Sequence, residues 1–112
     1  MSDQVGRKKR RDEEPELWRA FVRRGTPQIL IYLAEQGHAR ATDIDQAHEL
    51  IARQVIFIRL SELRSLGILT RTVVEGPPLA TRYELTEVGQ ELAAAAKAID
   101  ALTYDPRVTA VG

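Results

Sequence analysis

Few side chains in this sequence could carry out chemistry on a substrate. The chain has two histidines, His38 and His48, and no cysteine, and neither histidine has a second ligand at metal-binding spacing. The acids Asp43, Asp45 and Glu49 stand at positions i, i+2 and i+6, which is typical of a helix surface rather than of paired catalytic carboxylates. No glycine-rich phosphate loop, nucleophile elbow or Ser-His-Asp set is present. The sequence therefore predicts no enzyme, no catalytic residue, no metal and no cofactor.

A second group of side chains could bind the edges of nucleic-acid bases. If Ile56 is at the centre of the buried face of a helix over residues 52–66, a rotation of 100° per residue turns Gln54 and Ser61 outward. The guanidinium of Arg53 can pair with guanine and the amide of Gln54 with adenine, whereas the hydroxyl of Ser61 can reach bases or phosphates. The alternative is that all three are ordinary solvated side chains.

Two apolar side chains lie outside the buried face of this expected helix. Ile58 points outward, and Phe57 lies on one flank together with Arg53 and Arg64. Exposed apolar residues usually mark an interface. Phe57 and Ile58 therefore either contact the methyl groups of thymine or pack on another helix or another chain, and Arg64 joins Arg53 as a candidate for binding DNA.

Several short helices and one hairpin must position these residues. At 112 residues, of which 44% are apolar, the chain is long enough for one packed domain. Helical periodicity and end signals predict five helices, over about 16–24, 26–36, 42–50, 52–66 and 86–102. Between the last two, the hydrophobic period changes to 2, which predicts a hairpin with strands at 68–74 and 81–85 around the turn residues Gly76-Pro77-Pro78.

Particular residues are expected to begin, end and bury these helices. The expected N-caps are Thr26, Thr42 and Thr86. The expected helix ends are Gly25, Gly37 and Gly67. The expected core positions are Ile29, Leu30, Leu33, Ile56, Leu60 and Leu63.

Four helices, a hairpin and a last helix, in this order, predict a winged helix-turn-helix. The fold class is mainly α with a small β-hairpin (α+β), and the domain covers residues 15–104. Residues 1–14 are interpreted as a disordered charged arm and residues 105–112 as a flexible tail. The helix over 52–66 would enter the major groove of DNA, while the wing over 70–84 would lie on the backbone.

Two motifs resemble known regulators. The run IARQVIFIRLSELRSLGIL at 51–69 resembles the recognition-helix segment of HxlR-type and PadR-type proteins, in which a small cap and a leucine ladder lead into the wing. The run YELTEVG at 83–89 resembles the step from wing to last helix in the same families. The similarity covers about residues 26–102, is weaker for the MarR type, and implies a prokaryotic, homodimeric, DNA-binding transcriptional regulator.

The chain also departs from the HxlR pattern in two places. HxlR-type proteins usually have a tryptophan in the helix that holds Pro27-Gln28-Ile29-Leu30 here, and often an N-terminal cysteine; this chain has neither. Thiol or electrophile sensing is therefore not implied. The resemblance identifies neither the effector ligand nor the operator, and it does not distinguish an activator from a repressor.

The formal net charge is zero, but the charges are unevenly distributed. Five basic residues form one run, Arg7, Lys8, Lys9, Arg10 and Arg11. This run either binds DNA as an arm or serves as a solubilising tail. The nearly neutral remainder argues against strong DNA binding unless basic side chains cluster on one face.

Two arginines flank the expected wing. Arg71 and Arg82 could hold DNA phosphates or enter the minor groove. Alternatively, they are cross-strand partners of Glu75 or Glu84. The tip itself has no Lys or Arg, which disfavours deep reading of the minor groove.

The last helix has an apolar stripe that requires a partner. The stripe consists of Val88, Leu92, Ala95, Ala96, Ile99 and Leu102. It either folds back on the helix of Trp18 and Phe21 or pairs with a second copy across a two-fold axis. We expect a homodimer interface built from both helices.

The expected function is a DNA-binding regulator located in the cytoplasm at the nucleoid. No apolar run approaches the 18 residues of a membrane span, so no membrane partner is expected. The alternative is an adaptor whose winged helix binds another protein through Phe57 and Ile58. The near-neutral domain favours the adaptor, whereas the basic run, Arg53, Gln54 and the resemblance favour DNA.

Overall fold

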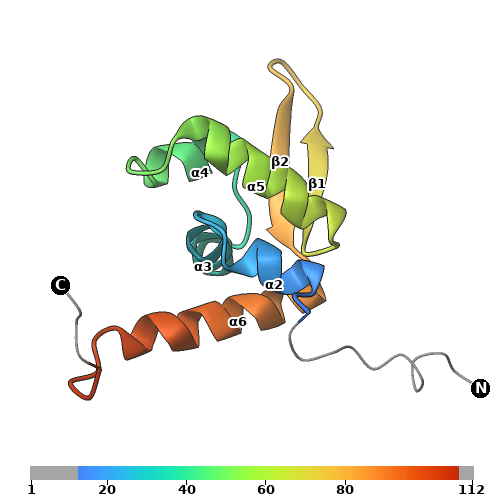
Figure 1. Cartoon of the computed structure of the whole chain (residues 1–112). Coiled ribbons are helices and arrows are strands. Elements are labelled where there is room, and N and C mark those ends of the chain that lie inside the picture. Colours follow the sequence, from blue (N-terminus) through green and yellow to red (C-terminus); the bar gives the residue numbers. More distant parts are fainter. Residues whose placement is uncertain (1–12, 109–112) are drawn as a thin grey trace, which may run out of the picture.

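The chain folds as a helical domain from which one hairpin projects (Figure 1). The computed structural model describes residues 13–108. Its helices are α2 (Glu16–Phe21), α3 (Thr26–Gln36), α4 (Ala41–Ala47), α5 (Arg53–Ser65) and α6 (Glu87–Leu102), and its strands are β1 (Leu69–Val74) and β2 (Ala80–Leu85). The predicted class, mainly α with a small hairpin, is confirmed, and the expected helix over 16–24 ends earlier, at Phe21.

The helix α5 forms because three apolar residues recur on one of its faces. Ile56, Leu60 and Leu63 are buried, as the i, i+4, i+7 spacing predicts. Gly67 follows the helix with φ +77°, a left-handed conformation that glycine adopts without steric cost. The chain therefore turns sharply from α5 into the first strand.

The helix α3 provides the centre of the core. Ile29, Leu30 and Leu33 are buried, as predicted, and Pro27 lies in the first turn. The prediction of Thr26 as N-cap is wrong: Gly25 holds that position with φ +97°. Thr26 is instead the first helical residue, and its buried hydroxyl has no hydrogen-bond partner among the described residues.

The helix α4 begins one residue earlier than expected. Its N-cap is Arg40, not Thr42. The backbone N–H of Arg40 donates to Asp43 Oδ2 at 3.1 Å, and the Arg40 guanidinium donates to both carboxylate oxygens of Asp43. An acid three residues after the N-cap satisfies a backbone donor that the helix leaves free. The Asp43 side chain thereby replaces the expected threonine cap.

The wing is a two-stranded antiparallel hairpin. Leu69 lies opposite Leu85, Arg71 opposite Tyr83, and Thr72 opposite Arg82. Tyr83 also exchanges two backbone hydrogen bonds with Ala39 at 2.8 and 3.1 Å, which fastens the base of the wing to the segment between α3 and α4.

The helix α6 packs along α3, on the opposite side of the domain from the wing tip (Figure 1). As predicted, Thr86 caps it, because its hydroxyl accepts a hydrogen bond from the Gly89 N–H at 3.1 Å. Ala93 and Ala96 are buried. A methyl group at Gly89 would collide with the carbonyl oxygen of Ile68, so a residue without a side chain lets α6 start close to the strand.

Candidate nucleic-acid interface

The outer face of α5 is exposed and contains no acidic side chain. Its exposed residues are Arg53, Gln54, Phe57, Ile58, Ser61, Arg64 and Ser65. The opposite face packs into the core through Ile56, Leu60 and Leu63. The structure thus brings together on one helix surface all the candidate residues that the sequence predicts on this element. These side chains supply two cations, an amide and two hydroxyls as hydrogen-bond groups.

Arg53 is held at the start of this surface by an ion pair. Its Nε donates to Asp45 Oδ2 of α4 at 3.1 Å, and the Asp45 side chain is 15% exposed while that of Arg53 is 67% exposed. This hydrogen bond uses one of the five guanidinium donors. The sequence analysis did not find this contact, because Asp45 precedes Arg53 by eight residues and belongs to another helix.

A second set of ion pairs fixes the other flank of α5. Glu62 accepts hydrogen bonds from Arg23 at 2.7 Å and from Arg59 at 3.3 Å. Arg59 also donates to the backbone oxygen of Arg24 at 2.8 Å, and Arg24 donates to that of Leu50 at 2.6 Å. The spacing of Arg59 and Glu62 within one helix could have revealed their ion pair. Arg23 and Arg24 precede α3 and are distant in sequence from α5, so spacing alone could not reveal their contacts.

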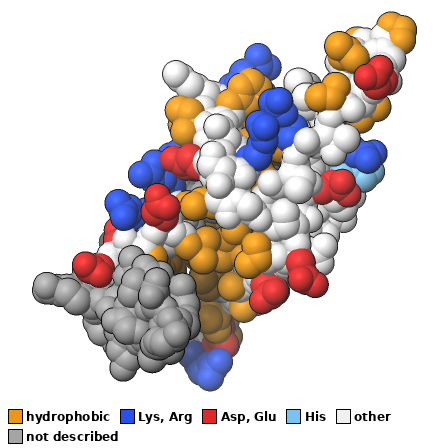
Figure 2. Space-filling view, turned by 90° about the vertical axis from the view of Figure 1, so that its right-hand side faces the viewer, with side chains coloured by type: hydrophobic (Ala, Val, Ile, Leu, Met, Phe, Trp, Pro, Cys, Tyr) orange, Lys and Arg blue, Asp and Glu red, His pale blue; other side chains and the backbone are white. Residues whose placement is uncertain are grey.

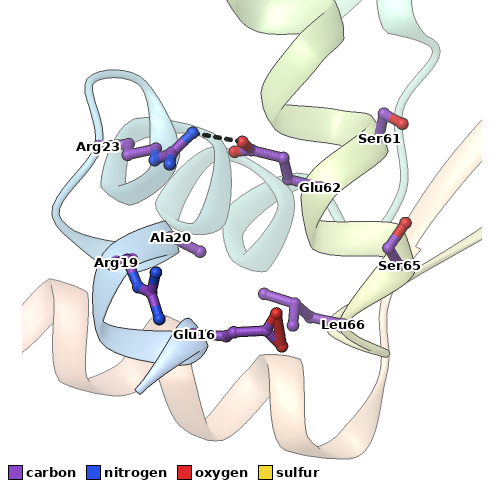
Figure 3. Close-up of a pocket in the computed structure, with 8 residues that line it drawn as sticks. All are labelled: Glu16, Arg19, Ala20, Arg23, Ser61, Glu62, Ser65 and Leu66. Atoms are coloured by element: carbon purple, nitrogen blue, oxygen red, sulfur yellow. Dashed lines mark hydrogen bonds and ion pairs between the residues drawn. The ribbon is translucent and has the colours of Figure 1, made fainter. Parts of the chain in front are cut away.

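Figure 3 shows the ion pair between Arg23 and Glu62 at the edge of a hollow between α2 and α5. The hollow has a volume of about 310 Å³. Arg23 points across it to Glu62, with Arg19 and Glu16 below on α2. Ser61 and Ser65 lie on its α5 wall. The ion pair of Glu62 with Arg23 therefore connects the turn after α2 to the helix that presents the candidate residues.

The two wing arginines project from opposite faces of the hairpin. Side chains alternate along a strand, so Arg71 shares a face with Leu69 and Tyr83, whereas Arg82 shares the other face with Thr72. Among residues 13–108, neither arginine forms an ion pair with Glu75 or Glu84. The Nε atom of Arg82 is buried without a hydrogen-bond partner in the same part of the chain.

The candidate dimerisation residues separate into two groups. Phe21 and Ala96 are buried in the core of the chain, and Leu92 packs partly against it. Trp18, Val88, Ala95, Ile99 and Leu102 are exposed. The stripe was expected to cover either the Trp18–Phe21 helix or a second copy, whereas α6 packs along α3. The rings of Trp18 and Phe21 contact each other edge to face, with centroids 6.1 Å apart.

Basic and acidic side chains are interspersed over the upper part of the face in Figure 2. On the face shown in Figure 2, Lys and Arg side chains lie mainly in the upper half, and hydrophobic side chains gather lower, near its middle. The basic run Arg7, Lys8, Lys9, Arg10 and Arg11 lies outside the described residues. At the other end of the described chain, Asp105 and Arg107 form an ion pair at 2.8 Å, which lowers the pKa of Asp105.

Three further observations concern a carboxylate, metal binding and membrane-spanning helices in the described chain. The hydrogen bonds from Arg40 hold the pKa of Asp43 below its ordinary value of 3.8, so this carboxylate stays charged at the start of α4. Within residues 13–108, no three His, Asp or Glu side chains lie close enough together to hold a metal ion. No helix in that range is long and apolar enough to cross a membrane.

Comparison with known proteins gives a consistent result. A family model described as HxlR-like helix-turn-helix matches residues 23–105. Diamide-treated YodB from B. subtilis is 24% identical with a TM-score of 0.67, over 82% of this chain and 93% of YodB. The redox regulator HypR in its reduced form is 23% identical with a TM-score of 0.70, over 81% and 89% of the two chains.

A third solved structure extends the fold similarity to another group of regulators. A protein assigned to the MarR family from Porphyromonas gingivalis W83 is 18% identical with a TM-score of 0.72, over 89% of this chain and 99% of that one. No curated protein sequence matches the chain.

Proposed function

The chain belongs to the HxlR-like helix-turn-helix family, and we propose that it is a dimeric transcriptional regulator that binds specific sites in double-stranded DNA. The family and the winged-helix fold support a DNA-binding regulator. In this proposal α5 enters the major groove and the wing lies on the backbone. The basic run at 7–11 adds contacts to phosphates.

The observation that carries the proposal is the outer face of α5. Seven side chains are exposed on it, two of them arginines and none of them acidic. Asp45 pairs with Arg53, and Glu62 pairs with Arg23 and Arg59, so Arg64 is the arginine of this face that forms no ion pair in the described chain. A chain with no net charge thereby presents a cationic, hydrogen-bonding helix surface to a polyanion.

A dimer accounts for the exposed part of α6. Val88, Leu92, Ala95, Ile99 and Leu102 are spaced alternately by four and three residues, the a/d pattern of helices that pair. We propose that this seam and Trp18 of α2 meet their counterparts in a second copy. Two α5 helices would then contact half-sites about one turn of DNA apart.

The signal that such a regulator detects is a separate question. YodB was treated with diamide, and HypR is described as a redox regulator. These 112 residues contain no cysteine, so we propose that this chain does not respond through oxidation of a thiol.

A DNA mobility shift at several salt concentrations tests the proposal. We expect the logarithm of the affinity for a site selected from random duplexes to fall linearly with the logarithm of salt, by about 0.9 for each phosphate contact. A scrambled duplex of the same length is the control and should bind at least about a thousandfold more weakly at physiological salt. Equal, weak binding to both duplexes would contradict the proposed function and favour a protein-binding adaptor.

A further inference from the structure

We propose that Phe57 and Ile58 read the methyl groups of two thymines on opposite strands of the DNA site. This inference rests on the proposed function, because it assigns chemistry to two side chains on the surface that would enter the major groove. The polar candidates on α5 do not explain why these two positions are apolar.

The first observation is that neither side chain is covered by the chain itself. Phe57 is 43% exposed and Ile58 is 47% exposed, although Ile56, immediately before them, is fully buried. The sequence left open whether these residues pack on another helix. Within residues 13–108 neither belongs to the hydrophobic core, so their free surface is available to a partner.

The second observation is the surrounding chemistry. The exposed side chains nearest in sequence on this face are Arg53, Gln54 and Ser61, all of them hydrogen-bonding groups, and the exposed face contains no carboxylate. The arginines on the Phe57 flank would attract a polyanion. The apolar partner that DNA offers in its major groove is the C5 methyl group of thymine.

The third observation is the position of the two residues around the helix axis. With 100° per residue from Ile56, Gln54 and Ile58 each lie about 20° from the middle of the outer face, whereas Phe57 lies about 80° from it, on the flank of Arg53 and Arg64. A helix with side chains is about 10–12 Å wide and nearly fills a major groove about 12 Å wide. Because the two side chains point about 100° apart on a helix that nearly fills the groove, Phe57 would contact the strand on the arginine flank and Ile58 the opposite strand.

Gln54 gives this arrangement a consistent base-pair preference. Its amide, at the middle of the face, can donate to and accept from adenine. Each adenine read in this way has a thymine as its partner on the other strand. Reading of one adenine by Gln54 therefore accounts for one of the two thymines, and the expected half-site contains a second A·T pair of the opposite orientation.

The experiment begins with selection of binding sites by the full chain from random duplex DNA. Each thymine of the selected half-site is then replaced by deoxyuridine, which removes only the methyl group. We expect a loss of about fourfold in affinity for each methyl that is contacted, from about 0.8 kcal/mol for burial of one methyl-sized group. Removing methyl groups from one strand should weaken binding through the lost contact with Phe57. Removing them from the other strand should weaken binding through the lost contact with Ile58.

Alanine variants connect each methyl group to one side chain. Phe57→Ala should abolish the response to deoxyuridine on one strand and keep it on the other, and Ile58→Ala should do the reverse. Both residues are exposed, so the variants should fold, which a thermal melt can verify. Gln36→Ala, exposed at the end of α3 and outside this face, is the control and should respond to both replacements as the wild type does.

The outcomes distinguish this inference from the function on which it rests. If no duplex is enriched, the proposed function fails. If a site is enriched but deoxyuridine weakens binding equally in the wild type and both variants, the reading by Phe57 and Ile58 is overturned while DNA binding stands. Unchanged DNA affinity in both variants would likewise overturn it and would assign the apolar pair to a protein partner.

Discussion

At the scale of single residues, the pairing of Arg53 with Asp45 changes what this arginine can do. An unpaired arginine on a helix surface loses side-chain entropy when it binds a base. Here the Nε–Oδ2 hydrogen bond of 3.1 Å already restrains the side chain at the N-terminal end of α5. The remaining donors of the guanidinium can then meet a guanine with less loss of freedom.

The first prediction concerns Arg53 and Gln54. If they bind bases, replacing either by alanine should cost about 1–3 kcal/mol on the selected site and little on random DNA. Fluorescence anisotropy with both duplexes measures the difference. Asp45→Ala should give a smaller, specific loss, because it removes the acceptor that restrains Arg53 but leaves the guanidinium donors of Arg53 in place. Equal effects on the two duplexes would assign both side chains to phosphate contacts instead.

The two arginines of the wing differ in a way that the sequence alone does not show. The sequence treats Arg71 and Arg82 as equivalent, but strand alternation and the observed register place them on opposite faces of the hairpin. Their expected acidic partners are not paired with them in the described chain. One arginine at most can therefore face the same DNA surface as α5 without a twist of the wing.

At the scale of elements, the register of α5 determines which residues face outward. A shift of one residue would bury Phe57 and expose Ile56. The second prediction tests this register through stability: Leu63→Ala should lower the free energy of unfolding by about 2–5 kcal/mol, because Leu63 is buried in the core. Ser61→Ala, two residues earlier and exposed, should change it by less than about 0.5 kcal/mol. Equal urea midpoints for the two variants would show that the register is wrong.

The third prediction concerns the start of α6. A methyl group at Gly89 would meet the carbonyl oxygen of Ile68, and a backbone atom cannot move aside as a flexible side chain can. Gly89→Ala should therefore destabilise the fold by about 1–3 kcal/mol or more, although alanine is the better helix former. Gln90→Ala, at the next and exposed position, is the control. A Gly89→Ala variant that melts as high as the wild type would contradict the close approach.

The helices and their buried faces could be predicted because they depend on local periodicity. The stripes of α3 and α5 and the cap of α6 at Thr86 lie where the sequence places them. The caps of α3 and α4 could not be predicted in the same way. Gly25 and Arg40 begin these helices because the preceding turn and the side chain of Asp43 determine the backbone there, and both override the usual preference for threonine.

The sequence predicts which residues share the outer face of α5, but it does not predict the ion pairs that join α5 to other parts of the chain. Helical geometry alone places Arg53, Gln54 and Ser61 on the outer side of α5, and they are exposed there. The contact of Glu62 with Arg23 joins residues 39 positions apart. Such a pair depends on how α2 and α5 pack, which the spacing of residues in one segment does not encode.

At the scale of the whole molecule, the last helix has a buried face and an exposed apolar face, which the sequence merges into one stripe. Ala93 and Ala96 are small and buried, so α6 can lie close to α3. The adjacent stripe, which includes Val88, Ile99 and Leu102, remains exposed. One helix can thus both complete the core and offer a seam, and the hydrophobic pattern alone does not separate these roles.

The last prediction tests assembly through this seam. Ile99 and Leu102 are 56% and 49% exposed, so replacing both with lysine should leave the fold intact while placing charges where two copies of α6 would meet. Because about half of each side chain is already buried, covering the rest in a dimer is worth about 1 kcal/mol per side chain, and a dimer covers two from each copy. Their loss is enough to shift a micromolar dimer to monomer. We expect light scattering to report twice the chain mass for the wild type and the chain mass for the variant. The affinity of the lysine variant for a duplex with two half-sites should also be lower than that of the wild type, because each monomer then binds alone. Ala101→Lys, exposed on another side of α6, should stay dimeric. A wild type that is monomeric at micromolar concentration would leave the seam without a second copy and would contradict the dimer.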